Sequence, residues 1–296
     1  MLWSDLPGWA NEDHAAAWAV FATTADLIGL SGSDLAELQP RARFETLFEP
    51  VEIVPPGTAH FTAYYEPELL AARACSDRFP APLHRPPPDF QPGHLWHGRA
   101  EISRGNLLTG HEIAFVESAI EAFLAQVQGS VRLRFEGGST LRLGFAGKNG
   151  HPYRSIGAEL IRRGIVSDPA QMTPEVIRRW CAENPEAVAD LLETNPSYVF
   201  FRPLDLPEGS GPLGATGRPV TAERSLAVDP EVIALGTPVW IDCPGLGTRL
   251  LVAQDIGSAI KGPGRGDIFL GSGPGAGARA GAVNTRGRMV MLRRRS

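Results

Sequence analysis

Two carboxylates, Asp255 and Asp267, lie in a glycine-rich segment (residues 253–269) that also carries Lys261 and Arg265. Glycine tolerates backbone conformations that other residues resist, and it lets a ligand approach the chain closely. A carboxylate held at a strand end beside such turns suits general acid catalysis. The alternative is a solvated loop with two ordinary turn aspartates. The neighbouring Lys261 and Arg265 favour a site without deciding the matter.

Length and composition limit the classes of function. The 296 residues suit two domains or one large one, and 43% hydrophobic residues suffice for sizeable cores. The net charge of −5 gives no general attraction to nucleic acid. The basic run Arg293–Arg295 is expected to be a solvated tail. The 33 Gly and 26 Pro indicate short strands joined by turns rather than a helical bundle.

Cysteine and histidine spacing indicates no thiol or metal chemistry, so we expect no metal and no organic cofactor. Cys75, Cys181 and Cys243 lack metal-ligand spacing, and the seven histidines form no His-x-x-x-His pair. No apolar stretch has the length of a transmembrane segment. The first ten residues do not resemble a signal peptide, so the protein is either cytoplasmic or numbered from after a removed leader.

Hydrophobic periodicity predicts the elements of the N-terminal half. Apolar residues at helical spacing predict helices over Ala15–Leu30 and Glu112–Ala125. A further helix is predicted over Ser33–Glu49, with Ser33 as its N-cap. His60–Pro67 is predicted to be a strand that ends in a turn. The proline-rich stretch Phe79–Gly93 is predicted to be a linker or an extended surface loop.

The rest of the chain is predicted to be mainly β. Alternation on both sides of Gly137-Gly138 predicts a hairpin of Val131–Phe135 with Thr140–Phe145. Helices are predicted over Ser155–Arg163 and Pro174–Glu183. Short strands separated by Gly and Pro turns then predict a β-barrel: Tyr198–Arg202, Val239–Asp242, Arg249–Gln254, Asp267–Leu270 and Arg288–Leu292.

The environments of Asp229, Asp255 and Asp267 in this C-terminal region are typical of strand ends, and further segments accompany them in order: Phe61–Pro67, Gln128–Ser130, Ala146–Gly157 and Asn195–Phe201. Together these segments resemble the membrane-bound lytic murein transglycosylase A (MltA) family, whose C-terminal part is a three-aspartate domain. Several long matches in order are more specific than any short motif. The chain departs from the family at Ala63, where glycine is usual, and at Ile256, where threonine or valine is common.

The resemblance implies a mainly β fold with some α structure and two domains. Residues 1–70 and 195–296 would form a discontinuous double-psi β-barrel catalytic domain. Residues 71–194 would form a smaller inserted β-barrel that binds substrate, with a cleft between the two.

The resemblance also implies cleavage of the β-1,4 bond between N-acetylmuramic acid and N-acetylglucosamine in peptidoglycan. The muramyl C6 hydroxyl attacks C1 and gives a 1,6-anhydro product, so that one carboxylic acid suffices. The family's acid falls on Asp267, which would act first as acid and then as base. Asp255 would support it by raising its pKa, by orienting the C6 hydroxyl or by holding Lys261; the alternative is a structural turn carboxylate. Asp229, before Pro230, is expected to be structural.

The residues expected to bind substrate are Thr62, Tyr64, Tyr65, Gln128, Ser130, Lys148, Asn149, Tyr153 and Lys261. Aromatic faces stack on sugars and hydroxyls bind their polar groups. Alternatives stay open for several of them. One tyrosine can serve the core, because adjacent strand residues point to opposite faces. Lys148 and Asn149 can form a turn, and Lys261 can pair with an aspartate.

The expected partners are peptidoglycan glycan strands and other cell-wall enzymes, with no nucleic acid and a monomeric chain. The family implies the periplasm or the periplasmic face of the outer membrane. One rival function is a hydrolytic glycosidase that uses Asp255 or Glu66 as a second reacting carboxylate. The other is a non-catalytic peptidoglycan-binding scaffold.

Overall fold

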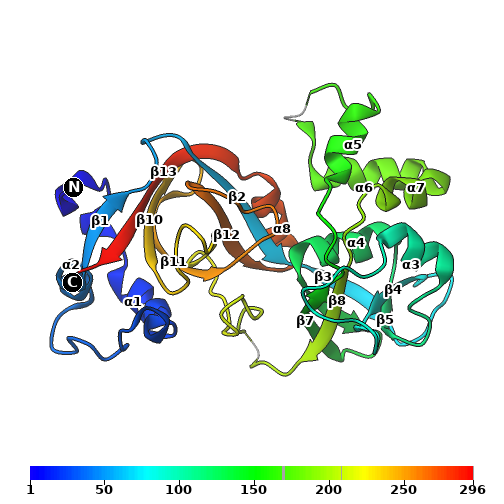
Figure 1. Cartoon of the computed structure of the whole chain (residues 1–296), viewed down its shortest axis with the longest axis horizontal. Coiled ribbons are helices and arrows are strands. Elements are labelled where there is room, and N and C mark those ends of the chain that lie inside the picture. Colours follow the sequence, from blue (N-terminus) through cyan, green and yellow to red (C-terminus); the bar gives the residue numbers. More distant parts are fainter. Residues whose placement is uncertain (169–170, 208, 296) are drawn as a thin grey trace. The chain divides into compact units, whose positions relative to one another are not determined.

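The computed structural model describes residues 1–168, 171–207 and 209–295, which form two compact units (Figure 1). The barrel unit consists of Met1–Tyr65 and Pro207–Ser296, and the inserted unit consists of Glu66–Leu206. The resemblance placed these boundaries after residues 70 and 194. The difference arises because the strands at 68–72 and 199–204 pair with other strands of the inserted unit.

The barrel unit contains a closed ring of six strands, in the order β13-β10-β11-β9-β12-β2, in which β2 returns to pair with β13. A seventh strand, β1 (Phe48–Glu52), pairs only with β13. The ring strands are β2 (Ala59–Glu66), β9 (Ser225–Ala227), β10 (Pro238–Cys243), β11 (Gly247–Asp255), β12 (Arg265–Ser272) and β13 (Asn284–Arg294). The strands predicted in the C-terminal part of this unit are therefore present, and β9 is a further strand that was not predicted.

Alternate residues of these strands fill the barrel interior. Phe61, Leu226, Leu251, Ile268 and Met289 are fully buried in one cluster. Burying such a side chain contributes about 1.5–3 kcal/mol to stability. Their neighbours in sequence point to the outer surface of the barrel, because the side-chain period of a strand is two residues.

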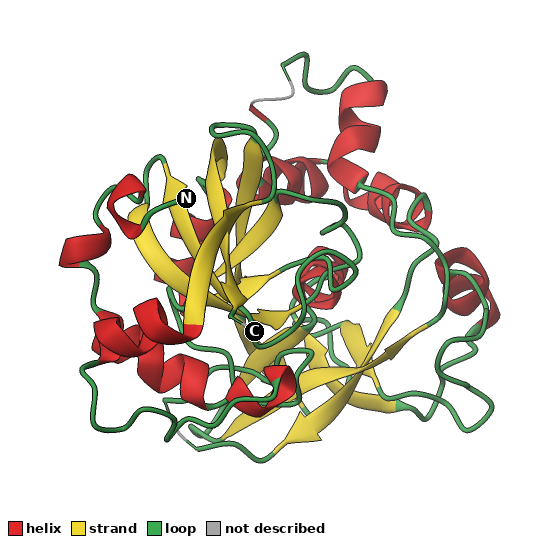
Figure 2. Ribbon diagram, turned by 60° about the vertical axis from the view of Figure 1, so that its left-hand side comes forward, coloured by secondary structure: helices red, strands yellow, loops and turns green. Residues whose placement is uncertain are grey.

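Helices cover the barrel on the outside. The helices α1 (His14–Ala22) and α2 (Pro40–Leu47) lie beside the strands of this unit (Figures 1 and 2). Their aromatic side chains belong to one buried cluster with Trp240 of β10. The predicted helix Ala15–Leu30 ends early, because α1 stops at Ala22 and a 3-10 turn follows over Ala25–Ile28.

The predicted helix Ser33–Glu49 is wrong in its first half, which forms turns rather than helix. The helix begins only at Pro40, whose missing N–H costs nothing in a first turn. In the same unit, α8 (Gly273–Gly281) follows β12 and was not predicted.

The inserted unit contains a second six-stranded sheet, in the order β4-β5-β3-β6-β7-β8. Its strands are β3 (Glu68–Ala72), β4 (Ala81–His84), β5 (Glu112–Val116), β6 (Ser130–Phe135), β7 (Thr140–Lys148) and β8 (Val199–Leu204). The β6–β7 pair is the predicted hairpin. Its helices are α3 (Arg99–Gly105), α4 (Ala119–Gln128), α5 (Ile156–Arg162), α6 (Pro174–Glu183) and α7 (Val188–Glu193). The mainly β fold class is confirmed.

The predicted helix Glu112–Ala125 is wrong in its first half, which forms β5. Ala114 and Val116 are both fully buried, at strand spacing. Ser118 then caps α4 by accepting from the backbone N–H of Glu121. The stretch Phe79–Gly93 also contains a strand, β4. By contrast, α5 and α6 begin and end within a residue of their predicted bounds.

Candidate active site

Asp255 and Asp267 lie in one row across three strands of the barrel. Ala227 of β9 is the register partner of Asp255 on parallel β11 and of Asp267 on antiparallel β12. Side chains in one row point to the same face of a sheet, and two strand spacings separate the outer Cα atoms by about 10 Å. The sheet therefore brings both carboxylates to the outer surface of the barrel.

A β-bulge on β11 turns Asp255 to that surface. The register shifts between Ala253 and Asp255, so Gln254 is an extra residue. Ala253 faces the interior, and strict alternation would point Asp255 there too. The bulge reverses its direction. Gln254 is itself fully buried and donates to Thr23 Oγ1 at 3.1 Å, which holds the bulge in place.

Thr62 of β2 connects Asp267 to Arg265. The Thr62 hydroxyl donates to Asp267 Oδ1, and Arg265 Nη2 donates to Thr62 Oγ1 at 2.8 Å. Because a guanidinium only donates, the single hydroxyl proton of Thr62 must go to Asp267. Among the described residues, Oδ2 of Asp267 has no hydrogen-bond partner. A proton on Asp267 therefore belongs on Oδ2.

The pKa of Asp267 is raised above its ordinary value. Burial is the largest cause, and the charge of Asp255 adds a smaller contribution in the same direction. The Thr62 hydrogen bond and the Arg265 charge oppose it without cancelling it. The expectation that Asp255 raises this pKa thus holds in sign, but burial matters more.

Asp255 is held by donors on both oxygens. Oδ2 accepts from the Tyr64 hydroxyl at 2.7 Å, and Oδ1 accepts from the backbone N–H groups of Ala215 and Ile256, both at 2.9 Å. Burial nevertheless raises its pKa. These bonds give Asp255 a fixed position, and Lys261 pairs with Asp229 instead.

The adjacent tyrosines point to opposite faces. Tyr64 is only 9% exposed and packs on Phe269 with ring centroids 5.2 Å apart, so it positions Asp255 instead of offering an open stacking surface. Tyr65 packs with the interior core and against α8. A Cβ at Gly277 would lie 2.8 Å from the Tyr65 ring, which explains the glycine there.

Asp229 forms an ion pair with Lys261 at a turn. Asp229 accepts from the Gly262 N–H at 2.8 Å and from Lys261 Nζ at 3.3 Å. The Gly262 N–H is the largest cause of the lowered pKa of Asp229. Asp229 is a turn carboxylate in this arrangement, and Lys261 is its exposed ion-pair partner.

The other expected binding residues belong to the inserted unit. Asn149 is fully buried: its amide donates to the carbonyls of His97 and Pro196 and accepts from the Tyr198 N–H, all at 2.8 Å. These contacts favour the structural alternative for Asn149 over a role in substrate binding. The remaining residues lie at element ends or in a loop: Gln128 ends α4, Ser130 begins β6, Lys148 ends β7, and Tyr153 is partly buried before α5.

Glu66 is not suited to be a second reacting carboxylate. Its side chain is 1% exposed, and it pairs with Arg132 at 3.1 Å and with Arg142 at 3.0 Å. A buried carboxylate held by two guanidinium groups is a structural ion pair, and attack on a sugar would require those bonds to break. The glycosidase alternative loses this candidate.

Arg265 is the site residue whose role the sequence did not predict. Its spacing of two from Asp267 on one strand was the available signal, because such residues share a face. Its link to Thr62 depends on the pairing of β2 with β12, which joins distant parts of the chain.

Two family models match successive parts of this chain. Residues 60–202 match the MltA specific insert domain, and residues 224–293 match the 3D domain. Membrane-bound lytic murein transglycosylase A of Escherichia coli K12 is 40% identical over 250 residues, or 80% of this chain and 66% of the relative. The chain thus aligns with slightly less than two thirds of that relative's length.

Solved structures agree over nearly the whole chain. A membrane-bound lytic murein transglycosylase from Agrobacterium tumefaciens is 33% identical with a TM-score of 0.86, covering 99% of this chain and 96% of that one. Escherichia coli MltA with bound chitohexaose is 32% identical with a TM-score of 0.80, covering 98% and 91%. On these matches, this chain belongs to the MltA family of lytic murein transglycosylases.

Proposed function

We propose that this protein cleaves the β-1,4 bond between N-acetylmuramic acid and N-acetylglucosamine in peptidoglycan and forms 1,6-anhydro-N-acetylmuramic acid, with Asp267 as the single acid and base. The observation that carries this proposal is the state of the Asp267 carboxyl. Burial raises its pKa, Thr62 occupies Oδ1, and Oδ2 has no hydrogen-bond partner among the described residues.

In the first step, Oδ2 of Asp267 gives its proton to the glycosidic oxygen as the C1–O bond breaks. The leaving sugar keeps the electron pair of that bond and the proton. Asp267 becomes a carboxylate, and the hydrogen bond from Thr62 and the nearby Arg265 charge stabilise it.

In the second step, the muramyl O6 attacks C1 and the Asp267 carboxylate takes the C6 hydroxyl proton. Asp267 is then protonated again, and no water is consumed. The nucleophile belongs to the substrate, so its effective concentration is high without a second protein group.

Asp255 has a supporting role in this proposal and does not react with the sugar. Its oxygens accept three hydrogen bonds, which would have to be broken before it attacked a sugar carbon. This favours a one-carboxylate mechanism over a hydrolase with two reacting carboxylates. Its charge also helps to keep Asp267 protonated.

Membership of the family supports the proposed substrate and location. The barrel unit carries the catalytic groups, with Thr62 at the acid, and the inserted unit contributes Gln128, Ser130, Lys148 and Tyr153 to glycan binding. The protein acts as a monomer on glycan strands at the cell envelope, in the periplasm or on the periplasmic face of the outer membrane. Within the described part of the chain, no helix is both long and apolar enough to cross a membrane.

The test is mass spectrometry of muropeptides released from purified peptidoglycan by the wild-type protein and by Asp267→Asn. The amide still accepts from Thr62 but has no proton of suitable acidity to give. Products one water lighter than hydrolytic ones, absent with Asp267→Asn, are expected. Products of hydrolytic mass would replace the proposal with a glycosidase, and no products from folded wild-type protein would indicate a binding scaffold.

A further inference from the structure

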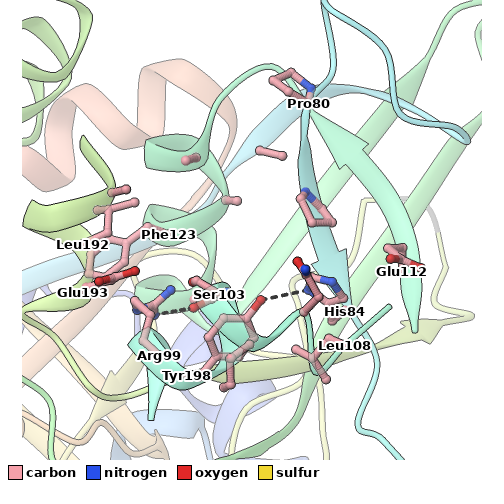
Figure 3. A pocket seen from close by; sticks show the side chains of 18 of the residues that line it. Pro80, His84, Arg99, Ser103, Leu108, Glu112, Phe123, Leu192, Glu193 and Tyr198 are labelled. Atoms are coloured by element: carbon pink, nitrogen blue, oxygen red, sulfur yellow. Dashed lines mark hydrogen bonds between the residues drawn. The ribbon is translucent and has the colours of Figure 1, made fainter. Parts of the chain in front are cut away.

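The inserted unit contains a cavity of about 380 Å³ among β4, α3, α4 and α7 (Figure 3). This volume lies within the range of small-molecule sites, which is about 300–1,000 Å³. Much of its wall is apolar, including Pro82, Ile102, Leu108, Phe123 and Leu192. All of its lining residues belong to the inserted unit, whereas Asp267 belongs to the barrel unit.

A buried cation lines this cavity. Arg99 is only 7% exposed, and burial lowers its pKa to about 10, so it stays charged at neutral pH. Its Nε donates to the Asn195 carbonyl, and Nη2 donates to Gln126 Oε1 and the Ser197 carbonyl. Its guanidinium carbon lies 4.7 Å from the Phe123 ring centroid.

Arg99 has no carboxylate partner among the described residues, and its Nη1 makes no hydrogen bond there. Among the described residues, Nη1 is not one of the completely enclosed side-chain atoms that lack a partner, so it keeps some exposed surface. A buried charge without a counterion is costly, and a charged donor left open in a cavity is suited to an anionic ligand.

The other titratable groups of the cavity limit which anion fits. His84 donates to or accepts from the Tyr198 hydroxyl at 2.8 Å, and burial lowers its pKa to about 4, so it is neutral at pH 7. Glu193 pairs with Arg104 at 2.5 Å. Glu112 lies across the cavity from Arg99 in the view of Figure 3 and accepts from the Gly110 N–H.

We propose that this cavity binds the carboxylate of an amino acid or short peptide, with Arg99 Nη1 as the charged donor and the apolar wall against the ligand's side chain. The carboxylates of Glu112 and Glu193 disfavour ligands with several negative charges, such as phosphate. The apolar wall favours a ligand with a hydrocarbon part. This binding site is independent of the proposed glycan cleavage.

Two sources can supply such a carboxylate: a free peptide, or the peptide attached to a wall glycan. Calorimetric titration with the dipeptide alanyl-alanine, with its C-terminal amide and with a disaccharide-peptide muropeptide distinguishes them. The dipeptide is expected to bind at least ~tenfold more tightly than its amide, which lacks the charge that Arg99 pairs with. Binding of the muropeptide as well would identify wall peptides as a source, and binding of the dipeptide alone would indicate the free one.

A blocking variant and a matched control test the location. Ala189 lines the cavity on α7 and is exposed, so Ala189→Trp is expected to abolish binding. Ala182 is exposed on α6 and does not line the cavity, so Ala182→Trp is expected to bind as the wild type does. Titrations on the Asp267→Asn background are expected to give the same affinities, which separates this site from catalysis.

Arg99→Lys keeps the charge but loses the planar fork, and it is expected to weaken dipeptide binding at least ~tenfold. Arg99 also donates to backbone carbonyls, so the melting temperature of the Arg99→Lys variant must be measured in parallel. If that variant unfolds, Ala189→Trp decides whether the cavity is the binding site. Equal binding of acid and amide, unchanged binding to Ala189→Trp, or no heat from any ligand would overturn the proposal.

Discussion

Thr62→Val tests the hydrogen-bond chain that orients the Asp267 carboxyl. Valine matches the shape of threonine but removes its hydroxyl. Asp267 Oδ1 then loses its donor, and Arg265 Nη2 loses its acceptor. The barrel core is unaffected, because Thr62 lies on the outer face of β2, opposite Phe61.

The magnitude follows from the charge on the acceptor. Hydrogen bonds to charged groups contribute about 1.5–3 kcal/mol, and one pKa unit corresponds to about 1.4 kcal/mol. The Thr62 hydrogen bond lowers the pKa of Asp267, so its loss should raise that pKa further. The same loss destabilises the carboxylate formed during cleavage and should slow turnover up to about ten- to hundredfold.

The assay is the initial rate of muropeptide release across a pH series. For Thr62→Val, the maximum rate should fall and the alkaline limb should move to higher pH, because Asp267 stays protonated longer. Thr62→Ser keeps the hydroxyl and should retain the wild-type limb. A Thr62→Val profile that overlays the wild type in both rate and pH dependence would refute the role of this hydrogen bond.

The remaining predictions concern stability. Because the pKa of Asp267 in the folded state lies above its ordinary 3.8, ionisation of this carboxyl opposes folding at neutral pH. The Asp267→Asn variant should therefore have a melting temperature no lower than that of the wild type at pH 7. Any gain in melting temperature should disappear below pH 3.8, where the carboxyl is protonated in both states. Tyr64→Phe removes a donor to a buried carboxylate and should lower the free energy of unfolding by about 1–3 kcal/mol in a urea titration. Gly277→Ala should cost about 1–3 kcal/mol against the Tyr65 ring, whereas Gly275→Ala on the same helix has open space and should stabilise by about 0.4–1 kcal/mol. Equal effects of the two glycine variants would contradict the packing explanation.

Strands with a clear period of two were predictable from local sequence. The β6–β7 hairpin and the C-terminal strands appear where alternation and glycine turns placed them. The structure of Glu112–Ala125 was not predictable in this way. Apolar residues at positions 113, 116 and 120 fit one continuous helix, and they fit equally a strand followed by a helix. Burial of Ala114 and Val116 in the sheet decided between them, and burial depends on the whole fold.

Asp255, Asp267, Thr62 and Tyr64 were all candidate site residues from sequence, because carboxylates beside glycine turns and the family motifs are local features. Asn149 and Glu66 were candidates on the same grounds, yet both are buried among fixed partners. Residue type indicates which chemistry a side chain can perform. It does not indicate whether neighbours from distant segments already occupy its polar atoms.

The sequence by itself therefore determined the family and the mainly β class, and it gave Asp267 as the candidate for the reacting carboxyl. The tertiary structure decided which way the Asp267 carboxyl points and what surrounds it. The row through Ala227, the bulge at Gln254 and the contact from Arg265 to Thr62 all depend on pairing between strands far apart in the chain. Strand alternation is a local property, but register and burial arise only when the barrel closes, and they fix both the direction and the pKa of Asp267.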